Sequence, residues 1–256
     1  MKIAVMIKQV ADTAARIELT PGGEAVKLAG VQLVLNPYDE FAVEQAIRVK
    51  EAAGGEVIVF NVGPASADEA VKTALAMGAD RAVLVREEAA QALDPAGLAA
   101  ILAALIKREG DCELVFCGKQ ATDGDSHQVG PAVAELLGLP SVTFITSFAL
   151  AGGEATVGRE ADGQRETLAV KLPALFSCQK GLNEPRYPSL PGIMQAGRKP
   201  RALVTLAELG LAPAPRVERL GLSLPAARAA GKRLAGETPA QVKQLVELLR
   251  NEAKAV

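Results

Sequence analysis

Residues 56–85 read EVIVFNVGPASADEAVKTALAMGADRAVLV, and this stretch predicts the repeating unit of the fold. The runs Glu56–Val62 and Arg81–Val85 are short and rich in β-branched residues, which favours β-strands. Between them the amphipathic run Ala67–Met77 predicts a helix, and Gly78 follows as a typical helix stop. A strand, a helix and a second strand in this order predict a right-handed βαβ unit with parallel strands.

The same alternation extends over the first 140 residues. Two more strands and three more helices are predicted there, at Ile3–Ile7, Glu113–Cys117, Asp39–Ala53, Pro95–Arg108 and Gln128–Leu137. Asn36 and Asp94 each precede a proline and are expected to cap helices, and Ser66 with Glu69 reads as a capping box. We therefore predict an α/β fold, a three-layer domain in which a parallel sheet carries helices on both faces.

The pattern changes after Pro140. Ser141–Leu150 predicts a strand, and Thr156–Glu160 and Thr167–Leu172 predict a β-hairpin extension that turns at Asp162-Gly163. The two strands of a hairpin are antiparallel, so we expect an antiparallel β-hairpin to extend the parallel sheet.

A loop rich in Pro and Gly is expected at about 181–200, and weak periodicity with scattered prolines predicts an extended arm over 201–256. The arm ends in a predicted helix, for which Thr238–Gln241 reads as a capping box with Pro at the first helical position. Four apolar residues fall on one face of this helix: Val242, Leu245, Val246 and Leu249. The organisation predicted is an α/β domain over 1–200 and an arm whose helix docks on its own domain or on another chain.

Composition excludes several classes of function. Of 256 residues 49% are hydrophobic, and the net charge of −2 gives no reason to expect nucleic acid or an anionic membrane as partner. The cysteines Cys112, Cys117 and Cys178 are odd in number and form no CxxC pattern, so neither a disulfide framework nor a zinc site is expected, and a reducing cytoplasm is favoured. No stretch approaches the roughly 18 to 20 apolar residues that span a bilayer.

Three segments follow predicted strands and are expected to lie at one edge of the sheet: Met6–Lys8, Asn61–Pro64 and Gly118–Gly130. Ligands of open parallel sheets bind beyond the carboxyl ends of the strands. The third segment opens a helix, whose free N–H groups form an anion site, and Ser126 and Gln128 add possible side-chain donors. A phosphate is the expected guest, although an ordinary polar loop capped by Asp125 or Ser126 fits the pattern equally well.

Other chemistry is not supported. No GxGxxG follows the first strand and no P-loop occurs. His127 is the only histidine, so it cannot build a multi-histidine metal site, and Asp123 and Asp125 are more often turn residues than metal ligands. Asp39 and Glu40 lie in the first turn of a predicted helix, where the helix dipole explains them. We predict no catalytic residue, and an adenylating enzyme is disfavoured because Lys8–Asp12 stands where an SGGxDS-type loop would be.

The sequence resembles the electron-transfer flavoprotein β subunits along nearly all of its length. The matching segments are Val5–Val10, Asn36–Ala42, Ala74–Asp80, Gly118–Ala121, Val157–Ser177, Leu182–Tyr187 and Leu190–Met194. The match within Val157–Ser177 departs from the family pattern at Gln164 and Phe176.

The resemblance implies the fold of the adenine-nucleotide α-hydrolase superfamily and an electron-carrier subunit, not an enzyme. It implies a heterodimer with an α subunit that holds most of the FAD, while the β subunit binds a structural AMP. By position the AMP pocket is expected to use Met6, Lys8, Asn36, Pro37, Tyr38, Asp39, Val62, Gly118, Lys119, Gln120, Ala121, Thr122, Asp123, Gly124, Asp125, Ser126, His127, Gln128 and Val129.

The resemblance also implies partner contacts. Electrons are expected from acyl-CoA or related dehydrogenases and are passed to a quinone-linked oxidoreductase. The loop at about 181–200 resembles the family's recognition loop, with Leu190 in the place of its anchoring leucine and Tyr187, Pro191, Ile193 and Met194 beside it. Glu160 matches a family acid that positions the flavin domain.

One segment favours a different member of the family. Asp123–Pro131 is more similar to flavin-bifurcating members, in which a second FAD replaces AMP and NADH is oxidised. The recognition loop is more similar to the ordinary members. Because the recognition loop is the longer match, we favour AMP and keep the second FAD as the alternative.

Overall fold

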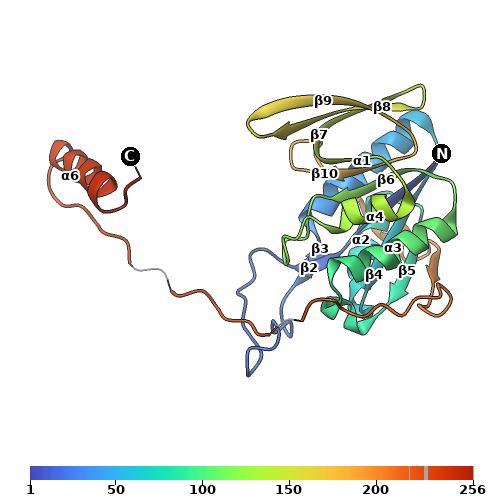
Figure 1. Ribbon diagram of the computed structural model, residues 1–256, viewed down its shortest axis with the longest axis horizontal. Helices are drawn as coiled ribbons and strands as arrows, with labels where there is room; N and C mark the ends of the chain where they lie inside the picture. The colour runs from blue at the N-terminus through green and yellow to red at the C-terminus, as the bar shows by residue number, and fades with distance from the viewer. Residues whose placement is uncertain (219, 228–229, 256) are drawn as a thin grey trace. The chain divides into compact units, whose positions relative to one another are not determined.

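A nine-stranded sheet runs through the part of the chain that the structure describes, residues 1–218, 220–227 and 230–255 (Figure 1). In this computed structural model the strand order is β11 (Arg201–Leu203), β5 (Arg81–Arg86), β4 (Glu56–Gly63), β1 (Lys2–Met6), β6 (Cys112–Gly118), β10 (Ala174–Cys178), β7 (Ser141–Ala151), β8 (Glu154–Ala161) and β9 (Gln164–Lys171). Neighbours from β11 to β7 are parallel, whereas β7, β8 and β9 pair antiparallel.

Helices cover both faces of the parallel part of the sheet. One face carries α1 (Pro37–Ala53) and α2 (Asp68–Met77), and the other carries α3 (Pro95–Glu109) and α4 (Val129–Leu137). The predicted three-layer α/β fold is therefore confirmed, and each of the four helices lies within three residues of its predicted bounds.

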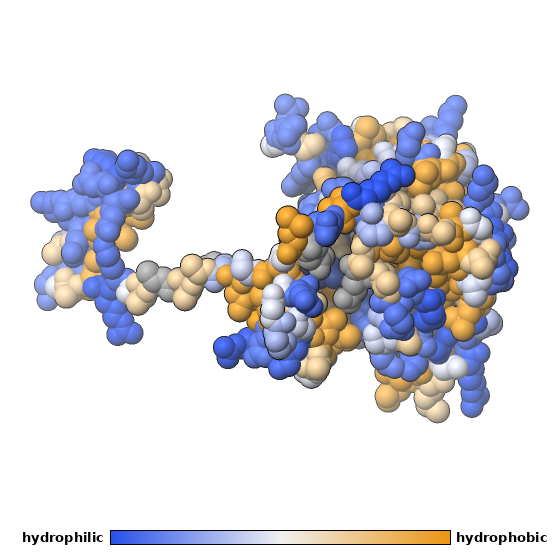
Figure 2. Space-filling model, turned by 60° about the horizontal axis from the view of Figure 1, so that its bottom comes forward, coloured by the Kyte–Doolittle hydropathy of each residue, from blue (hydrophilic) through white to orange (hydrophobic). Residues whose placement is uncertain are grey.

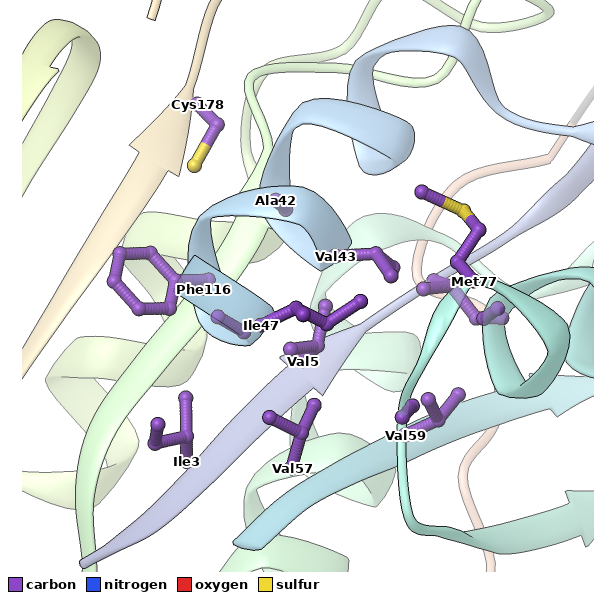
Figure 3. Packing of buried hydrophobic residues seen from close by; sticks show 14 of the residues in the cluster. Ile3, Val5, Ala42, Val43, Ile47, Val57, Val59, Met77, Phe116 and Cys178 are labelled. Atoms are coloured by element: carbon purple, nitrogen blue, oxygen red, sulfur yellow. The ribbon is translucent and has the colours of Figure 1, made fainter. Parts of the chain in front are cut away.

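Two hydrophobic cores lie on either side of the sheet because strand side chains alternate between its faces. On β1, Ile3 and Val5 belong to the core under α1 and α2, and Ala4 and Met6 belong to the core under α3 and α4. Figure 3 shows Ile47 of α1 packed against the residues of the first core. Packing on both faces holds β1, β4 and β6 side by side, so that their carboxyl ends lie at the same edge of the sheet.

The remaining elements are short or lie outside the sheet. They are the paired strands β2 (Gln9–Ala11) and β3 (Leu33–Leu35), the 3-10 helices η1 (Ala65–Ala67) and η2 (Glu88–Ala92), and the helices α5 (Leu190–Ala196) and α6 (Thr238–Asn251). Among the described residues, no helix combines the length and apolar character that crossing a membrane requires.

The chain divides into two units, Met1–Glu18 with Val26–Leu220, and Leu19–Ala25 with Gly221–Val256. Because β11 pairs with β5, the larger unit continues beyond residue 200, where the arm was predicted to begin. Residues 219, 228–229 and 256 of that arm lie outside the described residues. In the smaller unit, α6 exposes Val242, Leu245 and Val246, and Figure 2 shows hydrophobic residues on it among hydrophilic ones.

Some of the predicted local signals are confirmed. Asp94 caps α3, since its Oδ1 accepts the N–H of Gly97 at 2.8 Å. The turn between β8 and β9 is Asp162-Gly163, with φ of 50° and 77°, the positive values that a two-residue hairpin turn needs. The hairpin extension is thus formed as the sequence predicts.

Two predicted capping boxes are wrong, and one predicted N-cap is right in position but makes no side-chain bond. The Ser66–Glu69 capping box is absent because η1 precedes α2, which begins at Asp68 without a side-chain cap. The box predicted at Thr238 is replaced by Glu237 as N-cap, and the side chain of Gln241 instead donates to the carbonyl of Gly236 at 2.7 Å. Asn36 stands at the N-cap of α1, but its side chain makes no capping bond.

The sequence did not predict β10, β11, the β2–β3 pair or α5. All five residues of β10 are buried, so the strand has no alternation of apolar and polar residues to reveal it. The loop expected at about 181–200 contains α5, a helix of seven residues that Ser189 caps through the N–H of Gly192 at 3.2 Å.

Candidate functional site

A cavity of about 330 Å³ lies at the carboxyl ends of β1, β4 and β6. Its volume is near the lower end of the range of roughly 300–1,000 Å³ that is typical of ligand pockets. All three segments that were predicted at this edge line it, namely Met6–Lys8, Asn61–Pro64 and much of Gly118–Gly130. The prediction that these three segments lie together at one edge of the sheet is therefore confirmed.

Asp39 ties two of the strand ends together beneath the cavity. Its Oδ2 accepts the backbone N–H of Lys8 at 2.7 Å and its Oδ1 accepts that of Gly118 at 2.9 Å. Burial raises the pKa of Asp39 to about 7, against the opposing effect of these two hydrogen bonds. The helix-dipole interpretation of Asp39 is incomplete, because its carboxyl group joins β1 to β6.

Asn36 fixes the loop that follows β6. Its Nδ2 donates to the carbonyl oxygen of Gln120 at 2.8 Å, and its Oδ1 accepts the N–H of Thr122 at 3.2 Å. The side chain is 1% exposed, so both of its polar atoms depend on these bonds. The residue that was predicted to cap α1 therefore holds one wall of the cavity.

Two glycines allow helices to approach β6 closely. A Cβ at Gly118 would collide with Oδ1 of Asp39 and with Tyr38, and a Cβ at Gly130 would lie 2.8 Å from Sγ of Cys117. Any larger residue would move the start of α1 or of α4 away from the sheet. The first turn of α4 is thereby held at the edge of the cavity.

The start of α4 supplies free backbone donors. Val129 and Gly130 line the cavity at the first turn, where N–H groups have no intrahelical acceptor and the helix dipole is positive. Ser126 and Gln128 line it as well. This arrangement suits an anion such as a phosphate group.

Charged side chains gather on the same side. Nζ of Lys8 forms an ion pair with Asp123 at 2.7 Å, and the amide of Gln120 donates to Asp125. Nζ of Lys119 lies 4.9 Å from the centre of the Tyr38 ring, a cation–π contact. The polar side of the cavity thus carries two lysines whose ammonium groups are already partnered.

Another part of the cavity lining is an apolar wall, and the sequence did not predict it. Apart from Val62, it comes from η2, α3 and the residues between them, through Ala90, Leu93, Pro95, Leu98 and Leu102. A cavity with one apolar and one anion-binding side can hold a flat, apolar ring system that carries a phosphate.

Asn61 belongs to the predicted edge segment Asn61–Pro64 but not to the predicted AMP pocket. It is fully buried in β4, where its Nδ2 donates to the carbonyl of Ile7 at 3.0 Å and its Oδ1 accepts from Arg86 at 3.1 Å. A single Asn inside the apolar run EVIVFNV is the signal that could have identified it.

Of the predicted pocket residues, the structure brings sixteen to the cavity: Met6, Lys8, Asn36, Asp39, Val62, Gly118, Lys119, Gln120, Ala121, Asp123, Gly124, Asp125, Ser126, His127, Gln128 and Val129. Pro37, Tyr38 and Thr122 do not line it but lie beside residues that do. His127 packs edge-on against Phe144, with ring centres 5.4 Å apart. Within the described part of the chain, no group of three potential metal ligands comes together.

The residues predicted to bind partners lie elsewhere on the surface. Tyr187, Leu190, Ile193 and Met194 are 95%, 78%, 56% and 77% exposed. These four residues on and before α5 are called the docking surface below. Glu160 lies near the exposed end of β8, where its Oε1 is 3.7 Å from Arg165.

The matches to known proteins cover the whole chain. The family model described as "Electron transfer flavoprotein domain" matches residues 25–209. Proteins named electron transfer flavoprotein subunit beta are 41% identical in Bradyrhizobium diazoefficiens, over 99% of both chains, and 44% identical in Syntrophomonas wolfei, over 99% of this chain and 98% of the relative. The protein of that name in Mus musculus is 41% identical over 90% of this chain and 91% of the relative. The chain therefore belongs to the electron-transfer flavoprotein family as a β subunit, an electron-carrier component that works with an α subunit rather than a classical enzyme.

Proposed function

We propose that this β subunit binds AMP in the cavity as a structural group. Together with its α subunit, which holds most of the FAD, it accepts electrons from acyl-CoA-type dehydrogenases and passes them to a quinone-linked oxidoreductase. The observation that carries the proposal is the cavity at the ends of β1, β4 and β6, with the free N–H groups of α4 on one side and an apolar wall on the other.

The residues present fit AMP. The N–H groups of Val129 and Gly130 would hold the phosphate, with Ser126 and Gln128 as additional donors. The apolar side that includes Val62 would take the adenine ring. AMP supplies no redox chemistry when it is bound. Its contribution would be to fill the space between the helices and satisfy the donors at the start of α4.

The cavity can hold an adenylate, which both candidate nucleotides contain. FAD contains an AMP half joined to a second, flavin-bearing half, so both candidates can place an adenylate here. A space of about 330 Å³ lies within the range of roughly 300–1,000 Å³ that is typical of ligand pockets, so it can hold an adenylate, and the preference for AMP rests on the recognition loop, the longer match to the ordinary members. The alternative, a second FAD with oxidation of NADH, rests on the sequence of the loop Asp123–Pro131.

Nucleotide analysis of the native complex tests both. The α and β subunits are purified together without added nucleotide, extracted with acid, and the released nucleotides are identified and counted. One FAD and one AMP per heterodimer is the expected result. Two FAD and no AMP, with reduction of the complex by NADH, would establish the alternative. Absence of any adenine nucleotide beyond one FAD would contradict both.

Two more surfaces complete the proposal. The docking surface inserts its exposed apolar side chains, with Leu190 as the anchor, into a dehydrogenase. The exposed apolar residues of α6, with the arm that precedes it, dock on the α subunit, and Glu160 helps to position that subunit's flavin domain. Replacing Leu190 by Ala should impair reduction by a dehydrogenase and leave the heterodimer intact, as judged by gel filtration.

A further inference from the structure

Side chains of α1 bind the segment that carries the docking surface. Arg186 immediately precedes Tyr187, and its side chain lies between two carboxylates of α1. Its Nε donates to Glu44 at 2.8 Å, while Nη1 and Nη2 donate to Glu51 at 2.6 and 3.0 Å. Glu44 and Glu51 are seven residues apart, which places them on the same face of the helix. One guanidinium therefore joins two turns of α1.

Glu44 is the buried half of this clamp. Its side chain is 3% exposed, whereas those of Arg186 and Glu51 are 35% and 52% exposed. The same carboxylate also accepts the backbone N–H of Arg186 at 3.2 Å and Nε of Arg48 at 2.6 Å. A buried carboxylate with several donors fixes its partners more firmly than an exposed ion pair does.

Further bonds hold the segment on both sides of the docking surface. Before it, Nδ2 of Asn183 donates to the carbonyl of Phe41 at 3.0 Å. After it, Nζ of Lys199 donates to the carbonyls of Leu75 and Ala79, at 2.8 and 2.6 Å, at the end of α2. The backbone from 183 to 199 is thus tied to two helices while its large apolar side chains point outward.

Between these anchors α5 rests directly on α2. A Cβ at Gly192 would collide with the carbonyl oxygen of Ala76, so only glycine allows this approach. Ala196, at the end of α5, is 3% exposed. Three of the four residues of the docking surface therefore lie on a short helix that packs on α2, where the sequence predicted a loop.

We propose that Arg186 is a positioning residue for the electron-transfer partner, and that its ion pairs with Glu44 and Glu51 hold the docking surface in one preformed conformation. This inference rests on the proposed function, in which that surface contacts a dehydrogenase. A surface that is ordered before contact loses less conformational entropy on binding than a mobile loop does. Arginine suits the task because its planar fork donates from several fixed N–H groups to both carboxylates, whereas a lysine offers a single compact ammonium on a flexible stem.

The apparent affinity falls with the fraction of molecules that hold the competent conformation. If loss of the clamp lowers that fraction to about one tenth, the KM of a dehydrogenase for the complex rises about tenfold. Electron transfer within the docked complex is unchanged, so kcat stays constant. This split between KM and kcat is the signature of positioning.

The test uses the assembled complex with FAD and an acyl-CoA dehydrogenase that its acyl-CoA substrate has reduced. The variants are Arg186→Gln, Arg186→Lys, Glu51→Gln and Glu44→Gln. We expect the KM for the complex to rise about tenfold for Arg186→Gln and less for Arg186→Lys, with kcat unchanged. Hydrogen exchange of residues 187–196 should accelerate in parallel. Reduction by dithionite, which needs no docking, should stay at the wild-type rate.

Arg81→Gln is the matched control. Arg81 also joins two carboxylates, those of Glu56 and Glu109, but its side chain forms no hydrogen bond or ion pair with a residue of 182–199. It should lower the thermal stability of the complex and leave KM and the exchange of residues 187–196 unchanged. A variant that fails to fold does not block the test, because Glu51 is exposed and Glu51→Gln removes half of the clamp.

Each outcome decides between the two proposals. If Leu190→Ala raises KM and Arg186→Gln does not, the positioning role is wrong and the docking surface stands. If neither variant changes KM, the docking surface itself is wrong. If Arg186→Gln raises KM but the two glutamate variants leave both KM and hydrogen exchange unchanged, Arg186 contacts the dehydrogenase directly and the clamp is not its means of action.

Discussion

The side-chain amide of Asn36 donates to the backbone carbonyl of Gln120 at 2.8 Å, across 84 residues of sequence. This bond joins the start of α1 to the loop that follows β6, and residues of both segments line the cavity. A residue whose position suggests a local helix cap therefore makes a long-range contact that shapes the site.

Replacing Asn36 by Ala should leave the carbonyl of Gln120 and the N–H of Thr122 without partners. Unsatisfied buried groups cost about 1–3 kcal/mol, so the free energy of unfolding should fall by that amount in urea denaturation. AMP should also be lost from the purified complex, which acid extraction measures. Asn36→Asp keeps one acceptor but places a carboxylate against the carbonyl of Gln120, and it should be at least as destabilising. Wild-type stability in both variants would show that this bond does not hold the loop.

The pH dependence of stability should carry a contribution from Asp39. Burial raises its pKa from 3.8 to about 7 in the folded chain, so between about pH 4 and 7 the folded state keeps a proton that the unfolded state releases. The stabilisation is complete below about pH 4 and is lost as the pH rises through about 7. Urea unfolding at several pH values should show this decline.

Asp39→Asn removes the titrating group and should reduce that decline. Burial also raises the pKa of Glu40, so its contribution to stability falls as the pH rises, like that of Asp39. The pKa of Glu44 is lowered, so its contribution changes in the opposite direction. The quantity to compare is therefore the difference in pH dependence between Asp39→Asn and the wild type. Identical slopes in the two proteins would mean that Asp39 is ionised throughout this range.

Gly130→Ala should weaken nucleotide binding and stability together. The new Cβ would lie 2.8 Å from Sγ of Cys117, so α4 must move away from β6 at a cost of about 1–3 kcal/mol. Its free N–H groups move with it, and less AMP should remain in the complex after gel filtration. Gly197→Ala is the control, because a Cβ there meets no atom within 4 Å. Equal AMP content in both variants would exclude α4 as the anchor of the nucleotide.

Leu245→Glu in α6 should weaken association with the α subunit. Leu245 is 46% exposed and lies with Val242 and Val246 among the exposed apolar residues of the helix, so a charge there would have to be buried in an apolar interface. The dissociation constant of the heterodimer, measured by titration calorimetry, should rise at least about tenfold. Lys243→Glu changes the charge of the same helix at an exposed polar position and should have a much smaller effect. Unchanged affinity in the leucine variant would remove α6 from the interface.

The sequence predicted the parallel core well because its signals are local. In residues 56–85, two β-branched runs enclose one amphipathic run, and each signal lies within the element that it describes. The same holds for the hairpin turn at Asp162-Gly163 and for the cap of α3 by Asp94. The position of the cavity at the strand ends followed from the parallel sheet and required no side-chain detail.

The rest depends on contacts between distant segments. The side chain of Asn36 bonds to the loop after β6 and does not cap α1, and these partners lie more than 80 residues away in the sequence. The apolar wall comes from η2 and α3, whose residues read as ordinary core positions. Likewise, nothing local in the segment before Tyr187 shows that Arg186 will meet Glu44 of α1.

The strand order carries one more consequence. From β1 the chain travels through α1 to β4 on one side, and from β6 it travels through α4 toward β7 on the other, so these two connections leave on opposite faces of the sheet. A crevice opens wherever winding reverses in this manner, whatever side chains line it. The topology thus creates the crevice, and the neighbouring loops determine which ligand it can hold. Under the proposed function, changes in those loops alone could replace AMP by another adenylate-containing ligand without altering the sheet.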